Sequence, residues 1–258
     1  MGVLFSPGER RLRAGWRLAG QTILYFGLLL ALSLLLVAGG LLTGALTPQN
    51  LLTSKLAETL ALLGSIYAAR RWLDHRPLTG LGLAWGSRAR RELLAGLGIA
   101  AAMMGLVAAL LALAGTLHFV GFAWETQPAS QVAGDTLLML AVFVFVGFGE
   151  ELWLRGYILQ NLEDGLNLPW AVGVSSGIFA ALHLGNPDAS AVSTLGILLA
   201  GLLFALAYAR TRRLWLPIGI HIGWNFILHS VLGLPVSGLQ LGGLLVVRVS
   251  GPALLTGG

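Results

Sequence analysis

The sequence predicts an all-α protein: a polytopic bundle of transmembrane helices that forms one membrane domain over residues 1–258. Of its 258 residues, 56% are apolar and only 10% are charged, and the mean hydropathy is +0.82. This balance is typical of membrane proteins. Seven apolar segments approach or exceed the ~20 residues that a helix needs to cross a bilayer. They lie at about 18–46, 51–69, 93–117, 136–160, 169–186, 190–209 and 214–232.

The basic residues predict how these segments are oriented. The first segment follows an arginine cluster at residues 10–17, and it is too long for the core of a signal peptide, so we interpret it as an uncleaved span. Further arginines occupy 70–91, between the second and third segments, and 210–213, between the sixth and seventh. The loops at 47–50, 118–134 and 186–190 contain no Arg or Lys. The positive-inside rule therefore places the N-terminus in the cytoplasm and these loops outside.

Composition also limits the partners. The chain has no cysteine, which excludes disulfides, thiolate chemistry and cysteine-bound metals. The net charge of +5 comes from the clustered arginines, which favour anionic lipid headgroups rather than nucleic acid. A basic complement made almost wholly of arginine, in a chain rich in Ala, Leu and Gly, is typical of a GC-rich bacterial genome. We therefore expect a multi-pass protein of a bacterial cell membrane, with the lipid bilayer as a partner and no nucleic acid.

The two remaining segments are predicted not to span. Residues 76–92 form a cytoplasmic connection that is expected to lie along the membrane surface. Residues 233–258 are rich in glycine and contain only a short apolar stretch.

Polar residues interrupt the fourth, fifth and seventh apolar segments. Glu150 and Glu151 follow an almost wholly apolar run, His183 ends the next segment, and His221 and Asn225 lie in the last one. An ionised side chain inside a membrane costs at least a few kcal/mol, so such residues are rare and usually functional. Counting from the predicted cytoplasmic ends of the segments places all of these groups in one slab, on the cytoplasmic half of the membrane.

Helical spacing divides these residues into roles. His221 and Asn225 are four residues apart and share a helix face, as do Phe179 and His183. Glu151 and Arg155 have the spacing and order of a favourable ion pair. Glu150 points about 100° away from Glu151. We therefore expect Glu151 and Arg155 to pair and Glu150 to face the histidines, where a buried carboxylate with a raised pKa is suited to act as a general base.

Other features have simpler interpretations. His229 and His118 are expected near the outer surface, Lys55 and Glu58 as a local pair near an outer end, and Glu163 and Asp164 as solvated loop charges. Two Gly-x-x-x-Gly pairs, at 173–177 and 219–223, lie on the two His-bearing segments. They fit generic small-residue packing and equally a close approach that brings the polar groups together.

At these residues the chain resembles the CAAX protease and bacteriocin-processing family (CPBP, or Abi), intramembrane endopeptidases related to the type II CAAX prenyl endopeptidase. The family motifs Glu-Glu-x-x-x-Arg, Phe-x-x-x-His and His-x-x-x-Asn are matched, in order, by Glu150-Glu151-x-x-x-Arg155, Phe179-x-x-x-His183 and His221-x-x-x-Asn225. Each motif alone is weak, but the ordered trio on three apolar segments is specific. It defines a catalytic core at about 136–232.

The resemblance implies an eight-helix type of membrane fold with a cavity open toward the cytoplasm. It implies hydrolysis of a peptide bond near the C-terminus of a substrate or beside a membrane segment. Glu150 would activate water with help from His183, while His221 and Asn225 would position the water or stabilise the oxyanion. Family members usually continue beyond the position of Gly251–Gly258 into another apolar helix, so either the last span is truncated here or this member lacks it.

Metal dependence and function class stay open at this stage. Glu150, His183 and His221 have the residue types of a zinc site with an open position, although no His-Glu-x-x-His helix is present, and we favour glutamate-activated water with no obligatory metal. The first alternative function is a non-catalytic immunity or scaffold protein of the same fold. The second is a proton-coupled transporter, for which an internal repeat would be expected and none is seen.

Overall fold

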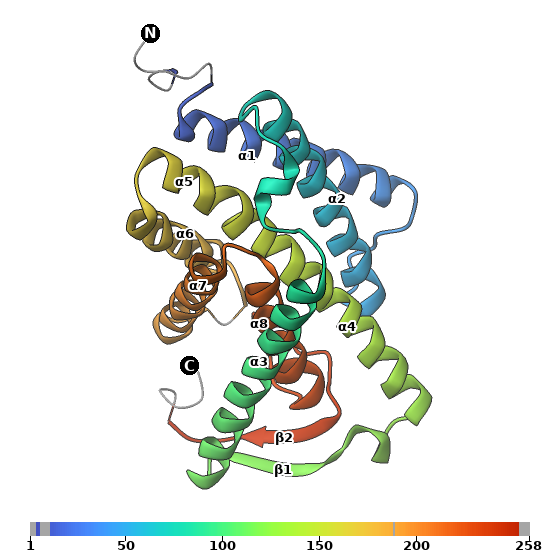
Figure 1. Cartoon of the computed structure of the whole chain (residues 1–258). Helices are drawn as coiled ribbons and strands as arrows, with labels where there is room; N and C mark the ends of the chain where they lie inside the picture. The colour runs from blue at the N-terminus through green and yellow to red at the C-terminus, as the bar shows by residue number, and fades with distance from the viewer. Residues whose placement is uncertain (1–3, 6–10, 188, 253–258) are drawn as a thin grey trace.

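The computed structural model describes residues 4–5, 11–187 and 189–252 of the chain, and most of them are helical (Figure 1). The helices are α1 (Ala14–Ala38), α2 (Pro48–Trp72), α3 (Ser87–Leu113), α4 (Ala129–Glu151), α5 (Leu159–Gly165), α6 (Leu168–Leu182), α7 (Ala191–Thr211) and α8 (Trp215–Asn225). Two π-helical segments, Leu152–Ile158 and Phe226–Val231, continue α4 and α8 directly. The prediction of an all-α membrane protein is confirmed.

The predicted apolar segments coincide with these helices, but their bounds and spanning capacity differ. The first helix ends at Ala38 rather than near residue 46, because Gly39 and Gly40 follow it and Gly40 adopts a positive φ of 67°. In the described part of the chain, four helices are long and apolar enough to cross a membrane: Ala14–Ala38, Ser87–Leu113, Ala129–Gly165 and Ala191–Thr211. The count of seven spans stays a prediction.

A short antiparallel sheet, which the sequence did not predict, closes one end of the bundle. Strand β1 (Leu117–Phe122) pairs with β2 (Leu245–Val249), with Leu117 opposite Val249 and Phe122 opposite Leu245 (Figure 1). Backbone hydrogen bonds from Ala123 to Leu244 and from Ser250 to Thr116 extend the pairing. The sheet ties the C-terminal segment to the loop between α3 and α4.

Two of the four glycines in the Gly-x-x-x-Gly pairs pack against a different helix from the one expected, and the other two have no close neighbour. A Cβ added to Gly219 would lie 2.3 Å from the carbonyl oxygen of Leu93, and one added to Gly223 would lie 2.8 Å from Ala100 Cβ, so both glycines pack α8 against α3. Gly173 and Gly177 have no atom within 4 Å of such a Cβ. The interpretation that these four glycines bring the two His-bearing helices together is therefore wrong.

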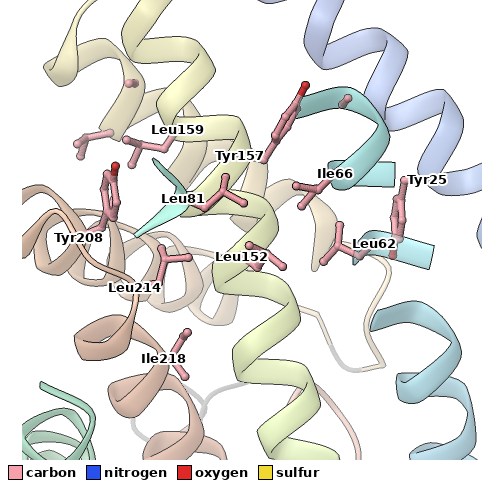
Figure 2. Packing of buried hydrophobic residues seen from close by; sticks show 14 of the residues in the cluster. Tyr25, Leu62, Ile66, Leu81, Leu152, Tyr157, Leu159, Tyr208, Leu214 and Ile218 are labelled. Carbon is pink, nitrogen blue, oxygen red and sulfur yellow. The ribbon is translucent and has the colours of Figure 1, made fainter. Parts of the chain in front are cut away.

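The main hydrophobic core lies where the N-terminal part of α8 meets the helix that runs from Ala129 to Gly165. Figure 2 shows Leu152 and Tyr157 of that helix between Leu214 and Ile218 on one side and Leu62 and Ile66 of α2 on the other. Leu81, from a 3₁₀ turn at Leu78–Leu81, is buried in the same cluster. The connection at 76–92 is thus packed into the bundle as well as joining α2 to α3.

Most arginines in the described part of the chain gather at one end of the bundle, where α1, α3 and α8 begin and α2 and α7 end; we call it the arginine end. Asp74 is fully buried there and contacts Arg17 at 3.3 Å, Arg70 at 3.6 Å and the Tyr157 hydroxyl at 3.3 Å. The opposite end, with the sheet, the loop at 39–47 and the loop at 183–187, is the loop end.

Two residues predicted to be solvated loop charges are instead ion-paired at the arginine end. Asp164 lies 2.9 Å from Arg11, 2.8 Å from Arg76 and 3.4 Å from Arg17. Glu163 accepts two hydrogen bonds from Arg212, at 2.6 and 2.8 Å. Both corrections have one cause: α5 continues the long helix of α4 into the arginine cluster, so its acidic residues meet cations from α1, α7 and the α2–α3 connection.

Candidate functional site

The site begins at Gly147, where α4 crosses α8 closely. A Cβ at Gly147 would lie 2.7 Å from Ile222 Cγ1 and 3.6 Å from His221 Cβ, so the absence of a side chain lets the two helices approach. Glu150 and Glu151 lie one turn further along α4, at its last residues before the π-helical segment. The close crossing therefore places both carboxylates beside His221.

Glu151 forms the buried centre of the polar cluster, with its side chain fully inaccessible to solvent. Its Oε1 accepts a hydrogen bond from Arg155 Nη1 at 3.0 Å, which is the ion pair that the sequence predicted. Arg155 Nη2 donates to the Gly201 carbonyl at 2.9 Å, and the guanidinium lies 4.7 Å from the Phe179 ring centroid. The charge of Arg155 is thus matched by a carboxylate, a carbonyl and an aromatic face.

The same carboxylate oxygen also holds His221, which the sequence did not predict. His221 Nδ1 lies 2.8 Å from Glu151 Oε1, and because a carboxylate accepts only, we assign the proton to Nδ1. The imidazole stacks on Phe204, with centroids 4.8 Å apart and planes 10° apart, and meets Phe179 edge-on at 6.0 Å. Its position and tautomer are therefore set by Glu151 and two phenyl rings.

Glu150 has a different environment from its neighbour. Its Oε2 lies 3.8 Å from His221 Nε2, and its side chain is 22% exposed. That oxygen has no hydrogen-bond partner among the described protein groups. As predicted, Glu150 turns away from the ion pair and faces a histidine, although only His221, and not His183, contacts the glutamate pair among the described residues.

A cavity of about 490 Å³ opens beside Glu150. Asn225 lines it one turn beyond His221, and His183 lines it from the end of α6. His183 Nδ1 lies 2.7 Å from the Phe179 carbonyl oxygen, so we assign the proton to Nδ1. In the neutral ring, Nε2 is then a hydrogen-bond acceptor. The structure thus brings Glu150, His183 and Asn225 to one cavity, with His221 behind Glu150.

The cavity contains further polar residues that were assigned elsewhere from the sequence. Lys55 and Glu58 form the expected local pair at 2.6 Å, and both line the cavity. The sequence contained a signal for the placement of Lys55 and Glu58 in the cavity, because ionisable residues in a spanning helix usually mark a functional site. His229, predicted to be interfacial, is buried; it also lines the cavity, and its Nε2 accepts from the Leu241 backbone N–H at 3.2 Å.

The cavity extends in the direction opposite to the one that was predicted. Beyond Glu150 it is lined by Val146, Val142 and Met139, which lead back along α4 toward the loop end. Side chains from the loop end, including Asn186 and Ser237, also line it. The arginine end is instead filled by the core of Figure 2. The resemblance implied a cavity open toward the cytoplasm, and the positive-inside rule predicts the cytoplasm at the arginine end. The packing of the arginine end does not agree with an opening there.

The three predicted zinc-binding residues are not gathered as a metal site. Within the described residues, no group of three or more His, Cys, Asp or Glu side chains is arranged to hold a metal ion. His221 and His183 engage Glu151 and the Phe179 carbonyl through Nδ1, which leaves Nε2 as the nitrogen of each ring that could bind a ligand. We therefore derive no chemical step through zinc, and metal dependence stays a question for measurement.

Two comparisons with known proteins bear on this site. Residues 132–227 match the family model described as type II CAAX prenyl endopeptidase Rce1-like, a range that contains all three motifs. The chain is also 31% identical over 138 residues to a Bacillus subtilis (strain 168) protein named "Putative membrane peptidase YdiL". That alignment covers 50% of this chain and 54% of the relative, so the chain spans about half the length of the relative it matches.

We predict that Glu151→Ala strongly destabilises the protein, because it leaves Arg155 buried without its carboxylate and releases His221. Breaking a buried ion pair costs about 3–5 kcal/mol. Glu163→Ala is the matched control, since it removes the half-exposed pair with Arg212 and is expected to cost less than about 1 kcal/mol. Thermal unfolding in detergent measures both. Equal melting temperatures for the two variants would show that the Glu151 cluster does not stabilise the fold.

Proposed function

We propose that this chain is an intramembrane endopeptidase, because the family model and the relative support its assignment to the CAAX protease family. It hydrolyses peptide bonds of membrane-associated or C-terminal peptide segments, using water activated by Glu150. The observation that carries the proposal is the arrangement of two carboxylates around one imidazole. Glu151 holds His221 Nδ1 at 2.8 Å, while Glu150 lies 3.8 Å from Nε2 and opens into the cavity.

This geometry suits the activation of water. A separation of 3.8 Å is too long for a direct hydrogen bond and is suited to a bridging water. The neutral tautomer leaves Nε2 as an acceptor, so Glu150 and His221 both offer acceptors to the same water. Glu150 has no cation paired with the oxygen that faces His221, whereas Glu151 is neutralised by Arg155. Glu150 is therefore the carboxylate that is free to take a proton.

In the proposed reaction, Glu150 removes a proton from water as the water oxygen attacks the peptide carbonyl carbon. The carbonyl oxygen becomes an oxyanion, which the Asn225 amide is placed to stabilise as a hydrogen-bond donor from the cavity wall. The C–N bond then breaks, and protonated Glu150 returns the proton to the leaving amine. One water is consumed, and a carboxylate and an amine are released.

The contacts of the two histidines support a different division of roles from the one that the resemblance implied. The resemblance assigned His183 as the partner of Glu150, but the short contacts join His221 to the glutamates. We propose that His221 positions the water, and that His183, held through Nδ1 by the Phe179 carbonyl, presents Nε2 to the substrate from the cavity wall.

We predict that Glu150→Gln lowers the rate of peptide hydrolysis by about 10²–10⁴-fold, the usual contribution of a general base. The side chain keeps its shape and forms no close ion pair with an Arg or Lys among the described residues, so the melting temperature is expected to stay near that of wild type. The assay uses purified protein in detergent with a mixed-sequence peptide library in H₂¹⁸O. Mass spectrometry then detects new C-termini that carry ¹⁸O.

Glu163→Gln serves as the control, because it removes a carboxylate at the arginine end instead of one at the cavity. Hydrolysis by wild type and Glu163→Gln, but not by Glu150→Gln, is the expected pattern. If Glu150→Gln keeps more than about a tenth of the wild-type rate, Glu150 is not the base. A wild-type protein that cleaves nothing in the library contradicts the proposed activity.

We further predict that strong chelators leave hydrolysis largely intact, because the proposed base is a carboxylate acting on water. Activity after dialysis against a zinc chelator, with elemental analysis of the same sample, tests this. Stoichiometric zinc in wild type that is absent from His183→Ala, together with activity that chelation removes and zinc restores, would instead establish a metallopeptidase.

A further inference from the structure

The cavity beside Glu150 is closed toward the arginine end by polar groups that satisfy one another. Trp153 Nε1 donates to Gln21 Oε1 at 3.0 Å, and Gln21 Nε2 donates to Ser65 Oγ at 3.0 Å. Gln21 and Ser65 are fully buried. The Arg17–Asp74 pair and Tyr157 lie beyond them, also buried. A peptide entering from the arginine end would have to break this hydrogen-bonded floor.

The opposite wall leads outward to the loop end. Val146, Val142 and Met139 line the cavity at intervals of three or four residues, so they form a track along one face of α4 that starts one turn from Glu150. The rim is made by the loops at 186–187 and 236–239. These loops touch, because a Cβ at Gly238 would lie 2.3 Å from the Pro187 carbonyl oxygen, and Ser237 at the rim is exposed.

Charge distinguishes the two ends. The arginines at 11–17, 70–76, 88–91 and 210–213 all belong to the arginine end, several of them in the ion pairs described above. The basic residues toward the loop end are Lys55, which is paired with Glu58 in the cavity, and Arg248 on β2. An excess of arginine marks the cytoplasmic side of a membrane protein. The cavity rim therefore lies on the other side.

We infer that the site is reached from the non-cytoplasmic side of the membrane, and that its substrates are peptide segments exposed there. The walls are largely apolar, from Phe26 and Leu29 of α1 to Leu182 of α6, with the Lys55–Glu58 pair as a polar patch. This lining suits the outward end of a membrane segment or a translocated apolar peptide. That these segments are substrates rests on the proposed function, whereas the direction in which the cavity opens is argued from the packing and the charges alone.

Because the chain has no cysteine, single-cysteine variants test the direction directly. Val146→Cys places a thiol inside the cavity, and Ser237→Cys places one at its rim. Ser130→Cys at the loop end and Ser87→Cys at the arginine end report the two sides. Val144→Cys is the matched control, because Val144 lies close to Val146 on α4 but on the outer surface of the helix, away from the cavity lining. Each is treated with a charged, membrane-impermeant maleimide in right-side-out and inside-out vesicles.

We expect Val146→Cys, Ser237→Cys and Ser130→Cys to react only in right-side-out vesicles, Ser87→Cys only in inside-out vesicles, and Val144→Cys in neither. Reaction of Val146→Cys and Ser237→Cys from the Ser87 side would overturn the inference. So would a Val146→Cys that stays unlabelled in both preparations while Ser237→Cys also fails to react from outside.

Activity in the same vesicles separates this inference from the proposed function. The water-soluble peptide library is added outside the vesicles, and Glu150→Gln vesicles serve as the blank. Cleavage is expected in right-side-out vesicles and, in inside-out vesicles, only after detergent is added. Cleavage by intact inside-out vesicles contradicts outward access while leaving the peptidase proposal intact. No cleavage in detergent contradicts the peptidase proposal, whereas the labelling still decides the direction of opening.

Discussion

The double hydrogen bond accepted by one oxygen of the Glu151 carboxylate is the interaction on which the arrangement of the site depends. One fully buried oxygen accepts from both Arg155 and His221. An ionised group inside a membrane protein is costly unless it is paired and hydrogen-bonded, and here each charge has a partner. This single contact joins α4, the π-helical segment that carries Arg155, and α8. Through Gly201 and Phe179 it also reaches α7 and α6.

The cluster forms only because the backbones come close enough. Gly147 lets α4 approach α8 at His221, and Gly96 and Gly219 let α3 support α8 from the other side. The π-helical segments begin directly after Glu151 and after Asn225. A π turn changes the direction in which side chains leave a helix and is frequent at functional sites. In this chain it separates Glu151 in the core from Trp153 in the cavity wall.

Local relations could be predicted from the sequence, and long-range ones largely could not. The Glu151–Arg155 pair, the local Lys55–Glu58 pair and the turn of Glu150 away from Glu151 follow from helical spacing. The contact between Glu151 and His221 joins residues 70 positions apart, and no spacing rule selects it over a contact with His183. Small-residue patterns showed that α8 packs closely but not that α3 is its partner. The β1–β2 pair joins two short segments with weak patterns, and the capture of Asp164 by arginines depends on tertiary placement.

A double-mutant cycle in hydrolysis rate between Glu150→Gln and His221→Gln tests the central claim most directly, because the account places both residues on one water. If they act as a unit, the double variant is about as slow as the slower single variant, as found for catalytic groups that work together. If the two losses multiply, as they do for independent sites, Glu150 and His221 do not share a water, and the proposed role of the Glu151–His221 contact is contradicted.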